Sequence, residues 1–321
     1  MFNTINRTQS TPLTLPANTG NPHSLEAQIG NTPLLHLHKT AVAHNIAPAV
    51  SIYAKAEWYN PGGSVKDRPA YNIIRTAEEN GRLRPGMTLL DATSGNTGIA
   101  YAMLGAARGY KVKLVMPANV SPERVAILRA YGAELTLTDP AEAADGAIRE
   151  AQRLATADPS IFYADQYNND ANWQAHYWTT ANEIWEQTDG QLTHFVVGVG
   201  TSGTFMGNTR RLRELNPTIK FITGQPDSPK NSIEGWKHMP TAIVPGIYDD
   251  TLADRNMNTS TADAQQMVKF LARTEGLFVG VSSGAAVATA IRVAQELEEG
   301  VVVTVLPDSG FKYLSEDFWD E

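Results

Sequence analysis

The sequence predicts an α/β protein built from parallel sheets that are covered by helices. From about Leu25 onward, short β-branched runs alternate with amphipathic helical stretches, an order typical of parallel strands joined by helices. The chain has 321 residues, which corresponds to two domains of ~150 residues each. Hydrophobic residues make up 42% and charged residues 19% of it, a balance that allows a sizeable buried core.

The alternation is most regular in the first half of the chain. Runs rich in β-branched and aliphatic residues there are followed by stretches with helical periodicity. Strands are predicted at Ser51–Glu57, Met87–Ala92, Lys111–Met116 and Glu134–Thr138, and helices at Val65–Asn80, Gly98–Arg108, Pro122–Tyr131 and from the last strand to about Ala157.

The second half continues the alternation with longer connections. The stretch Gln225–Asp250 carries four prolines and is too long for an ordinary connection, so we expect it to be functional. Strands are predicted at Phe195–Val199, Lys220–Thr223, Leu277–Val281 and Val301–Leu306, with a helix after the first and after the third.

Charge and composition exclude several classes of function. The formal net charge is −8, which disfavours non-specific binding to nucleic acid or to an anionic membrane. The chain has no cysteine, so disulfides, thiolate metal sites, iron–sulfur clusters and a cysteine nucleophile are excluded. There is no H-E-x-x-H motif either, and we expect no metal. No apolar run reaches the 18 residues that suggest a membrane-spanning helix.

The first 23 residues are rich in Ser, Thr, Asn and Pro. Such a composition predicts a flexible tail. An apolar core of the kind found in secretory signals is missing from it, whereas its single arginine and lack of acids also fit an organelle-transit segment.

Ligands of open parallel sheets bind where strands end and helices begin, and five such junctions stand out. The first runs from Asn60 to Pro69, where two glycines turn the chain and Lys66 falls at a helix start. The positive end of the helix dipole disfavours a cation there, which favours the neutral amine that a Schiff-base lysine needs. A solvated surface lysine is the alternative interpretation.

The second junction is Thr93-Ser-Gly-Asn-Thr-Gly98. Hydroxyls, backbone amides and a helix N-terminus converge in it, as in a pocket for a carboxylate or phosphate. An ordinary helix cap with a glycine turn is the alternative, but four polar side chains in one short loop exceed what capping requires.

The third junction, Gly198-Val-Gly-Thr-Ser-Gly-Thr204, satisfies G-x-G-x-x-G after a strand. That pattern is typical of a dinucleotide loop, which also needs an acid about 20 residues further on. Gln225 stands near that position and Asp227 lies beyond it. The hydroxyl-rich loop suits a single terminal phosphate better, although a nicotinamide-dependent dehydrogenase stays open.

The last two junctions are weaker indications of a ligand site. Gly280-Val-Ser-Ser-Gly284 imitates the nucleophile elbow of hydrolases, a fold that needs a histidine after the serine. None of the seven histidines follows Ser282, so we discount a hydrolase. Pro307-Asp-Ser-Gly310 has the composition of a turn.

Together these motifs resemble the cysteine synthase family of fold-type II pyridoxal-phosphate (PLP) enzymes. The resemblance spans roughly Leu25 to Ser315, and the stretch from Gln166 to Tyr248 looks most like the B-type isozyme of bacteria. The motifs that carry it are Asn31-Thr-Pro-Leu34, Pro61-Gly-Gly-Ser-Val-Lys-Asp-Arg68, Thr93–Gly98, Gly200–Thr204, Gly280–Gly284 and Pro307–Gly310.

The resemblance implies two parallel-type α/β domains of the tryptophan synthase β-like architecture. Residues 24–66 and 180–315 would form a larger, cofactor-anchoring domain, and residues 67–179 a smaller one with the substrate loop. Residues 1–23 would be the flexible tail. A homodimer and a cytoplasmic location are further expectations from the family.

The resemblance also implies the roles of individual residues. Lys66 would form the internal aldimine with pyridoxal 5'-phosphate and later move the substrate α-proton. Asn96 would bind the cofactor's ring hydroxyl, Ser309 its pyridine nitrogen, and Gly200, Thr201, Ser202, Gly203 and Thr204 its phosphate. Thr93, Ser94, Gly95, Thr97, Gln166 and Gly246 would bind the substrate, with Lys237 as a further candidate.

A neutral serine at the pyridine nitrogen does not hold a proton there as a carboxylate does, so the ring is a weaker electron sink. That favours prompt loss of a β-substituent, giving an aminoacrylate to which a sulfur nucleophile adds. We therefore predict synthesis of L-cysteine from O-acetyl-L-serine, or O-phospho-L-serine, and sulfide.

Lys237 and His238 stand where B-type relatives carry arginines, so phosphoserine and thiosulfate stay open as substrates. Another β-replacement enzyme, of the cystathionine β-synthase or diaminopropionate synthase type, is the alternative within the class. A catalytically idle homologue should lack Lys66 or Asn96, and both are present.

Overall fold

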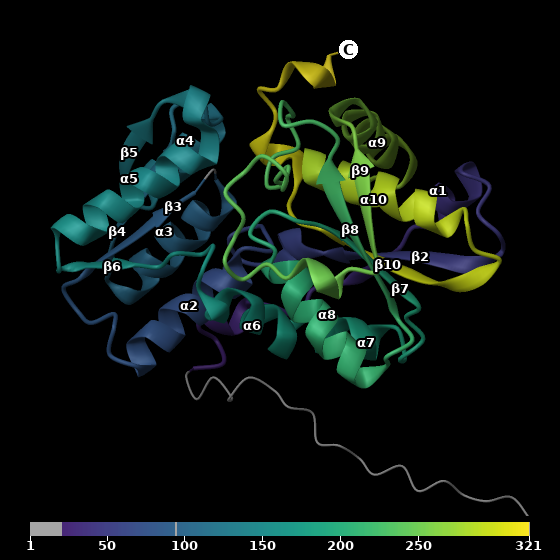
Figure 1. Cartoon of the computed structure of the whole chain (residues 1–321), viewed down its shortest axis with the longest axis horizontal. Helices are drawn as coiled ribbons and strands as arrows, with labels where there is room; N and C mark the ends of the chain where they lie inside the picture. Colours follow the sequence, from purple (N-terminus) through teal and green to yellow (C-terminus); the bar gives the residue numbers. More distant parts are fainter. Residues whose placement is uncertain (1–20, 94, 321) are drawn as a thin grey trace, which may run out of the picture.

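Two separate sheets make up the fold of the computed structural model, which describes residues 21–93 and 95–320 (Figure 1). Most of the predicted tail and Ser94 therefore lie outside the described residues. The larger sheet contains, in spatial order, β1 (Leu34–His36), β2 (Ala49–Ala56), β10 (Glu299–Leu306), β7 (His194–Gly198), β8 (Lys220–Pro226) and β9 (Arg255–Thr259).

The smaller sheet has four strands, all parallel. In the larger sheet only β1 runs antiparallel to its neighbour. The predicted α/β class with parallel sheets is thus confirmed. The order in the smaller sheet is β5 (Glu134–Thr138), β4 (Lys111–Pro117), β3 (Thr88–Ala92) and β6 (Ile161–Tyr163).

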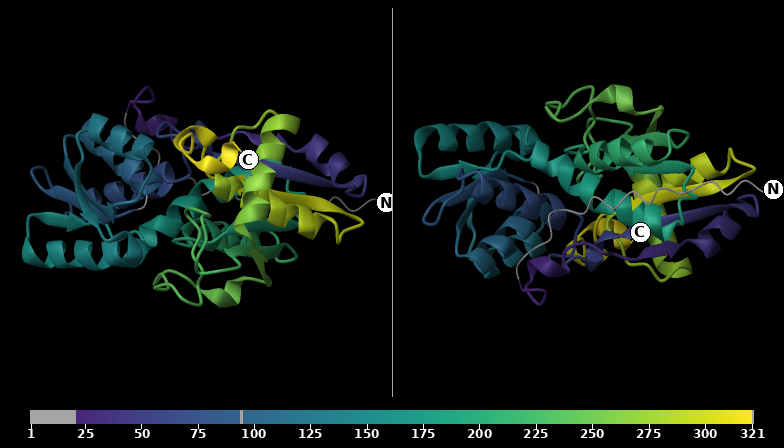
Figure 2. Two further views of the ribbon diagram at one scale, coloured as in Figure 1. Left: turned by 90° about the horizontal axis from the view of Figure 1, so that it is seen from above. Right: turned by 90° about the horizontal axis from the view of Figure 1, so that it is seen from below.

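Helices cover both sheets, which Figure 2 shows from above and from below as two neighbouring lobes. The described helices of the smaller lobe and its border are α2 (Asp67–Glu79), α3 (Asn96–Arg108), α4 (Pro122–Ala130), α5 (Ala143–Ala157) and α6 (Asp170–Trp178). Those beside the larger sheet are α1 (His38–Ala43), α7 (Thr180–Gln187), α8 (Gly203–Leu215), α9 (Thr261–Thr274) and α10 (Val281–Ala294).

Both faces of each sheet are buried, as expected for parallel strands. Along β3, Leu89 packs with the side chains of α3, whereas its neighbour Leu90 packs on the opposite face with those of α5. In the larger sheet, Val302 belongs to the core beneath α10 and Val303 to the core beneath α8. Successive residues of one strand therefore pack into the hydrophobic cores on opposite faces of the sheet.

The strand predicted at Leu277–Val281 is wrong. Val279 makes only an isolated bridge to Ser309, and Val281 already begins α10. The backbone groups of this segment pair with the chain after β10: Gly280 N donates to Asp308 O at 3.2 Å, and Phe278 O accepts from Gly310 N at 2.9 Å. Strand β9 is not predicted by the sequence, because its residues Arg-Asn-Met-Asn-Thr include few strand formers.

A long segment without helix or strand, residues 227–249, connects β8 to the short turn before β9. It contacts the smaller lobe at several places. Lys237 Nζ lies 3.2 Å from Asp145 Oδ1 on α5, and Gly246 N donates to Asn168 Oδ1 at 3.0 Å. This segment is the one expected to be functional from its length and prolines.

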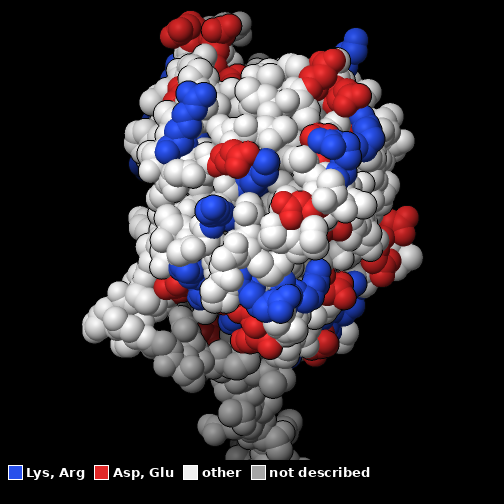
Figure 3. Space-filling model, turned by 90° about the vertical axis from the view of Figure 1, so that its left-hand side faces the viewer, with Lys and Arg blue, Asp and Glu red and all other residues white. Residues whose placement is uncertain are grey.

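Figure 3 shows the outer face of the smaller lobe, where acidic and basic side chains are interspersed. Several of its charges are paired with each other, including Arg149 with Glu142 and Lys113 with Glu134. Within the described residues, no helix is long and apolar enough to span a membrane. The strands of the smaller sheet all fall between residues 67 and 179, and the domain boundaries themselves stay a prediction.

Candidate active site

A pocket lies where loops that follow strands of both sheets meet. It is lined by eleven of the residues singled out from the sequence: Lys66, Thr93, Gly95, Asn96, Thr97, Gln166, Gly200, Thr201, Ser202, Thr204 and Lys237. These eleven residues span 171 positions of the chain, and the further lining residue Tyr313 lies 247 positions after Lys66.

Lys66 lies directly before α2, at the end of a turn that follows β2. Gly63 makes this turn with φ at +75°, a conformation that favours glycine. Val65 N donates to Pro307 O at 2.8 Å, so the turn is tied to the segment after β10. Burial lowers the pKa of the Lys66 ammonium to about 8, against the opposing effect of the Asp308 carboxylate. At pH 7 about one tenth of the amine is then neutral, far more than for a lysine with the ordinary pKa of 10.5.

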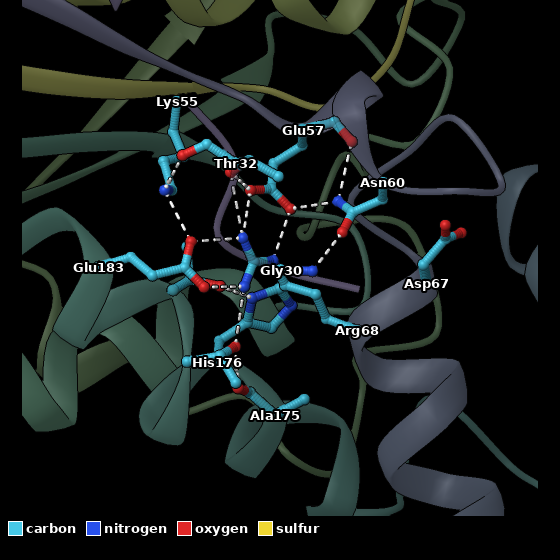
Figure 4. A network of polar contacts seen from close by, with 12 residues as sticks. Gly30, Thr32, Lys55, Glu57, Asn60, Asp67, Arg68, Ala175, His176 and Glu183 are labelled. Carbon is cyan, nitrogen blue, oxygen red and sulfur yellow. Dashed lines mark hydrogen bonds and ion pairs between the residues drawn. The ribbon is translucent and has the colours of Figure 1, made fainter. Parts of the chain in front are cut away.

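A buried charge network anchors the first turn of α2 (Figure 4). Arg68 donates from Nε and Nη2 to the Glu57 carboxylate at 2.7 and 2.8 Å, and from Nη1 to Glu183 at 2.6 Å. Lys55 Nζ lies 2.7 Å from the other Glu183 oxygen. Although burial alone would raise it, Arg68 and Lys55 together hold the pKa of Glu183 below its usual range. The two positive charges of this network thus neutralise its two carboxylates. Arg68, at its centre, lies two positions after Lys66 in the chain.

The loop between β3 and α3 presents the groups expected to bind a substrate carboxylate. Thr93 Oγ1 accepts hydrogen bonds from Gly95 N and Gly98 N, each at 3.1 Å. The Thr97 hydroxyl donates to Gln166 Oε1 at 2.8 Å, and Gln166 Nε2 donates to Ala92 O at 2.6 Å. Threonine hydroxyl and glutamine amide are therefore held together at a helix N-terminus, where an anion is favoured.

The loop between β7 and α8 forms a cradle with little space for side chains. A Cβ on Gly200 would lie 1.9 Å from Gly235 O, and one on Gly203 would lie 1.9 Å from Asn172 Oδ1. Ser202 adopts a left-handed conformation with φ at +70°, and its buried hydroxyl has no hydrogen-bond partner among the residues that the structure describes.

Such a buried hydroxyl costs free energy unless a ligand satisfies it. The hydroxyls of Thr201 and Thr204, the backbone amides of the loop and the start of α8 complete a set of donors for a phosphate. Together with the Lys66 amine, this donor set fits pyridoxal phosphate, which carries one phosphate and one aldehyde.

His176 supports the cradle from α6. Its Nε2 lies 3.3 Å from Thr204 Oγ1, and its Nδ1 lies 2.9 Å from Thr180 Oγ1. Burial lowers the pKa of His176 well below its usual value, and the nearby Arg68 and Lys66 charges lower it further. The ring is therefore neutral and bridges two hydroxyls as one donor and one acceptor.

Three further predicted residues do not line the pocket directly. Gly203 is the first residue of α8, Gly246 lies in the long segment before β9, and Ser309 precedes the short 3₁₀ helix Gly310–Lys312. None of these three is among the lining residues, and their roles stay predictions, as does that of Ser94.

Several residues that line the pocket were not predicted from the sequence, chiefly Arg124, Glu234, Trp236 and Tyr313. Arg124 lies in the first turn of α4, forms an ion pair with Glu234 and lies 4.8 Å from the centre of the Tyr313 ring. Its Cδ would be 2.6 Å from a Cβ on Gly95. The position of Ser-Pro-Glu-Arg124 after a strand was the available signal, because it is one more strand-to-helix junction.

Comparison with known proteins now identifies the class. A family model described as pyridoxal-phosphate dependent enzyme matches residues 25–308, so the chain is an enzyme of this class and pyridoxal phosphate is its cofactor. This favours the phosphate interpretation of the Gly198–Thr204 loop over the dinucleotide one.

Individual relatives narrow the assignment. The chain is 51% identical over 292 residues to the cysteine synthase of Aquifex aeolicus (strain VF5), and the match covers 89% of each chain. It is 44% identical to cysteine synthase B of Escherichia coli (strain K12), over 93% of this chain and 96% of the relative. A crystal structure of cysteine synthase from Entamoeba histolytica matches with a TM-score of 0.88 at 37% identity, over 95% of this chain and 92% of that one. The chain belongs to the cysteine synthase family.

Proposed function

We propose that this enzyme makes L-cysteine from O-acetyl-L-serine and sulfide by β-replacement. The observation that carries the proposal is the shared pocket, in which Lys66 lies with both the Gly200–Thr204 cradle and the Thr93–Thr97 loop. When bound, pyridoxal phosphate supplies the electron-withdrawing ring that makes the substrate α-proton removable and lets the β-substituent leave.

The residues of the chain would do the rest. Lys66 is the base that takes the α-proton, because its lowered pKa makes the neutral amine far more abundant near neutral pH than in an ordinary lysine. Thr97 and Gln166 already form a hydrogen-bonded pair, and both can turn a donor toward the substrate carboxylate. The start of α3 adds the favourable end of a helix dipole for that anion.

Charge pairing around the pocket favours a neutral ester as the donor. Among the described lining residues, Lys237 is paired with Asp145 at 3.2 Å, and Arg124 is paired with Glu234. A phosphate ester or thiosulfate needs an uncommitted cation to offset its desolvation. An acetyl ester does not, so O-acetyl-L-serine suits this pocket better than O-phospho-L-serine, and sulfide suits it better than thiosulfate.

A substrate panel tests the proposal. The enzyme is mixed with O-acetylserine, O-phosphoserine or serine and with sulfide, thiosulfate or homocysteine, and products are identified by mass spectrometry. We expect L-cysteine from O-acetylserine and sulfide as the fastest reaction. Reaction of serine with homocysteine alone would show a cystathionine-forming enzyme instead.

Asp145→Asn tests the charge argument within the same panel. Freeing Lys237 from its carboxylate partner should raise kcat/KM for O-phosphoserine several-fold, on the scale of one charge-assisted contact of about 1 kcal/mol. Use of O-acetylserine should change little. The double variant Asp145→Asn with Lys237→Met is the matched control and should lose the gain; a gain that survives in it would refute the role of Lys237.

A homodimer and a cytoplasmic location complete the proposal. Exposed large apolar side chains support association, since Phe311 and Leu314 are 67% and 59% exposed. Sedimentation of the purified protein should give twice the chain mass of 34.9 kDa, and fractionation of the source cells should place the enzyme with cytoplasmic proteins. A monomer, or recovery from an organelle fraction, would refute the respective part.

A further inference from the structure

The segment that follows β10 brings two buried charges to the edge of the pocket. Asp308 is fully buried and Lys312 is 7% exposed. Burying an ammonium and a carboxylate is costly unless each is satisfied. Neither residue has a role in the proposed reaction, so their partners show what they do.

Within residues 21–93 and 95–320, the acceptors of Lys312 all come from the two segments that carry the cofactor chemistry. Its Nζ lies 2.8 Å from Asn96 Oδ1 at the start of α3 and 3.1 Å from Gly63 O in the turn before Lys66. A third acceptor, Gly62 O, lies at 3.5 Å. One ammonium thus joins the turn before the reactive lysine to the side chain of Asn96.

The amide of Asn96 is held at both ends. Its Nδ2 donates to Asp308 Oδ2 at 2.8 Å, and the same oxygen accepts from the Tyr313 hydroxyl at 2.9 Å. An ammonium can only donate and a carboxylate can only accept. The amide oxygen must therefore face Lys312 and the amide nitrogen must face Asp308, which leaves no freedom to flip the side chain.

This arrangement leaves one N–H of Asn96 uncommitted. Because a cation sits on the oxygen end of the amide, the amide is polarised and its free N–H is a stronger donor. We propose that Lys312 is a positioning residue that fixes and polarises Asn96, so that the free N–H of Asn96 meets the ring oxygen of bound pyridoxal phosphate. The proposal rests on the cofactor assignment, whereas the choice of donor and sulfur nucleophile does not enter it.

A purely structural role is the competing explanation, in which Lys312 only ties down the Gly62–Gly63 turn. The two explanations differ in whether the effect of Lys312 passes through Asn96. A double-mutant cycle separates them, since residues that act through one another are non-additive.

The cycle combines Lys312→Met with Asn96→Ala in the holoenzyme. Two quantities are measured without substrate: the visible absorption and circular dichroism of the bound cofactor, and the rate of cofactor release into a scavenger. Lys312→Met should shift the visible spectrum and speed release about tenfold, the size of one charge-assisted hydrogen bond. Lys312→Arg keeps the charge and the hydrogen-bond donors, so its visible spectrum and its release rate should stay close to those of the wild type.

In the Asn96→Ala background, Lys312→Met should add less than about twofold to the release rate. A further tenfold increase of the release rate in the Asn96→Ala background would overturn the proposal. An unchanged visible spectrum in the single variant Lys312→Met would overturn it as well. Exposed Lys39 supplies the matched control, because Lys39→Met removes a charge remote from the pocket and should change neither quantity.

Should Lys312→Met not fold, Lys312→Gln takes its place in the cycle with the same decisive outcomes. Failure of this cycle leaves cysteine synthesis untouched, because no substrate is used. A wild-type protein without any bound cofactor would instead refute the proposed function together with this inference.

Discussion

Single residues carry most of the chemistry, and Ser202 shows how a residue can be built for a ligand. Its hydroxyl is buried next to the start of α8, without a hydrogen-bond partner in the described part of the chain. A protein that folds around an unsatisfied hydroxyl loses stability unless binding repays it. The Ser202 hydroxyl should therefore lower the stability of the cofactor-free protein and raise that of the cofactor-bound protein.

Ser202→Ala tests this reasoning. The variant should bind pyridoxal phosphate about tenfold more weakly, because one hydrogen bond to a charged phosphate is lost. The free energy of unfolding of the cofactor-free protein should stay equal or rise. Equilibrium binding by absorption and denaturant unfolding measure the two quantities.

Thr209→Val is the matched control for Ser202→Ala. Thr209, further along α8 and outside the pocket, also has a buried hydroxyl with no partner in the described ranges 21–93 and 95–320. Removing that hydroxyl should leave cofactor affinity unchanged. Equal loss of affinity in both variants would mean that Ser202 acts through the stability of α8 and does not contact the phosphate.

The sequence predicted the residues at junctions but not the contacts between them. Lys66, Asn96 and the Gly200–Thr204 loop stand out because glycines and polar residues interrupt regular patterns. Lys312 and Arg124 occur in ordinary helical or turn contexts, and their partners lie 216 and 110 residues away in the chain. Pairings of that kind depend on how the two sheets pack, which no local pattern encodes.

Among the elements, strand β3 carries a buried carboxylate, that of Asp91, close to the site. This carboxylate affects the stability of the fold and also contacts Gln166 of the pocket. Asp91 Oδ1 accepts from Ala92 N at 2.8 Å, and Oδ2 accepts from Gln166 N at 3.3 Å. Burial nevertheless raises the pKa of Asp91 from 3.8 to about 8. The folded protein therefore holds a proton on Asp91 at pH values where the unfolded chain has lost it.

This shift makes the contribution of Asp91 to stability fall as pH rises between about 4 and 8, because the folded state binds more protons than the unfolded state over that range. Asp91→Asn mimics the protonated form and removes the dependence. Between about pH 5 and pH 7, the free energy of unfolding of the wild type should fall relative to the variant by up to about 1.4 kcal/mol per pH unit.

Exposed Asp158 provides the control for this pH series. Hydrogen bonds from the hydroxyl and amide of Ser160 lower its pKa, so it stays charged in both folded and unfolded states above about pH 5. Asp158→Asn should therefore leave the slope unchanged. A wild-type slope equal to that of Asp91→Asn would contradict a raised pKa for Asp91.

Predicted elements agree with the structure where the pattern fits one kind of element, and they fail where it fits two. The helix at Pro122–Tyr131 is observed as Pro122–Ala130, and the strand at Glu134–Thr138 is observed unchanged. Leu277–Val281 fails because an apolar run of five residues fits either a strand or the start of a buried helix. Its last residue belongs to α10, and Val279 pairs with Ser309 only at an isolated bridge.

At the scale of the whole molecule, the pocket exists only because two sheets meet. Lys66 and the Gly200–Thr204 loop follow strands of the larger sheet, whereas Thr93–Thr97 and Gln166 follow strands of the smaller one. Ion pairs from residues 234 and 237 to Arg124 and Asp145 cross between them. Motion of one sheet relative to the other would therefore open or close the site around a substrate.

The composition of the whole chain also bears on the reaction. Since the chain has no cysteine, no protein thiol can carry sulfur as a persulfide. Sulfide must therefore attack the bound substrate directly, within the pocket that holds the cofactor.

Pyridoxal phosphate bound to Lys66 in this pocket underlies the whole proposed reaction. Reduction of the holoenzyme with borohydride, followed by proteolysis and peptide mass spectrometry, locates the lysine that carries the cofactor. We expect modification of Lys66 and its loss in Lys66→Ala. Modification of Lys312, Lys237 or another lysine in place of Lys66, or of none, would contradict it.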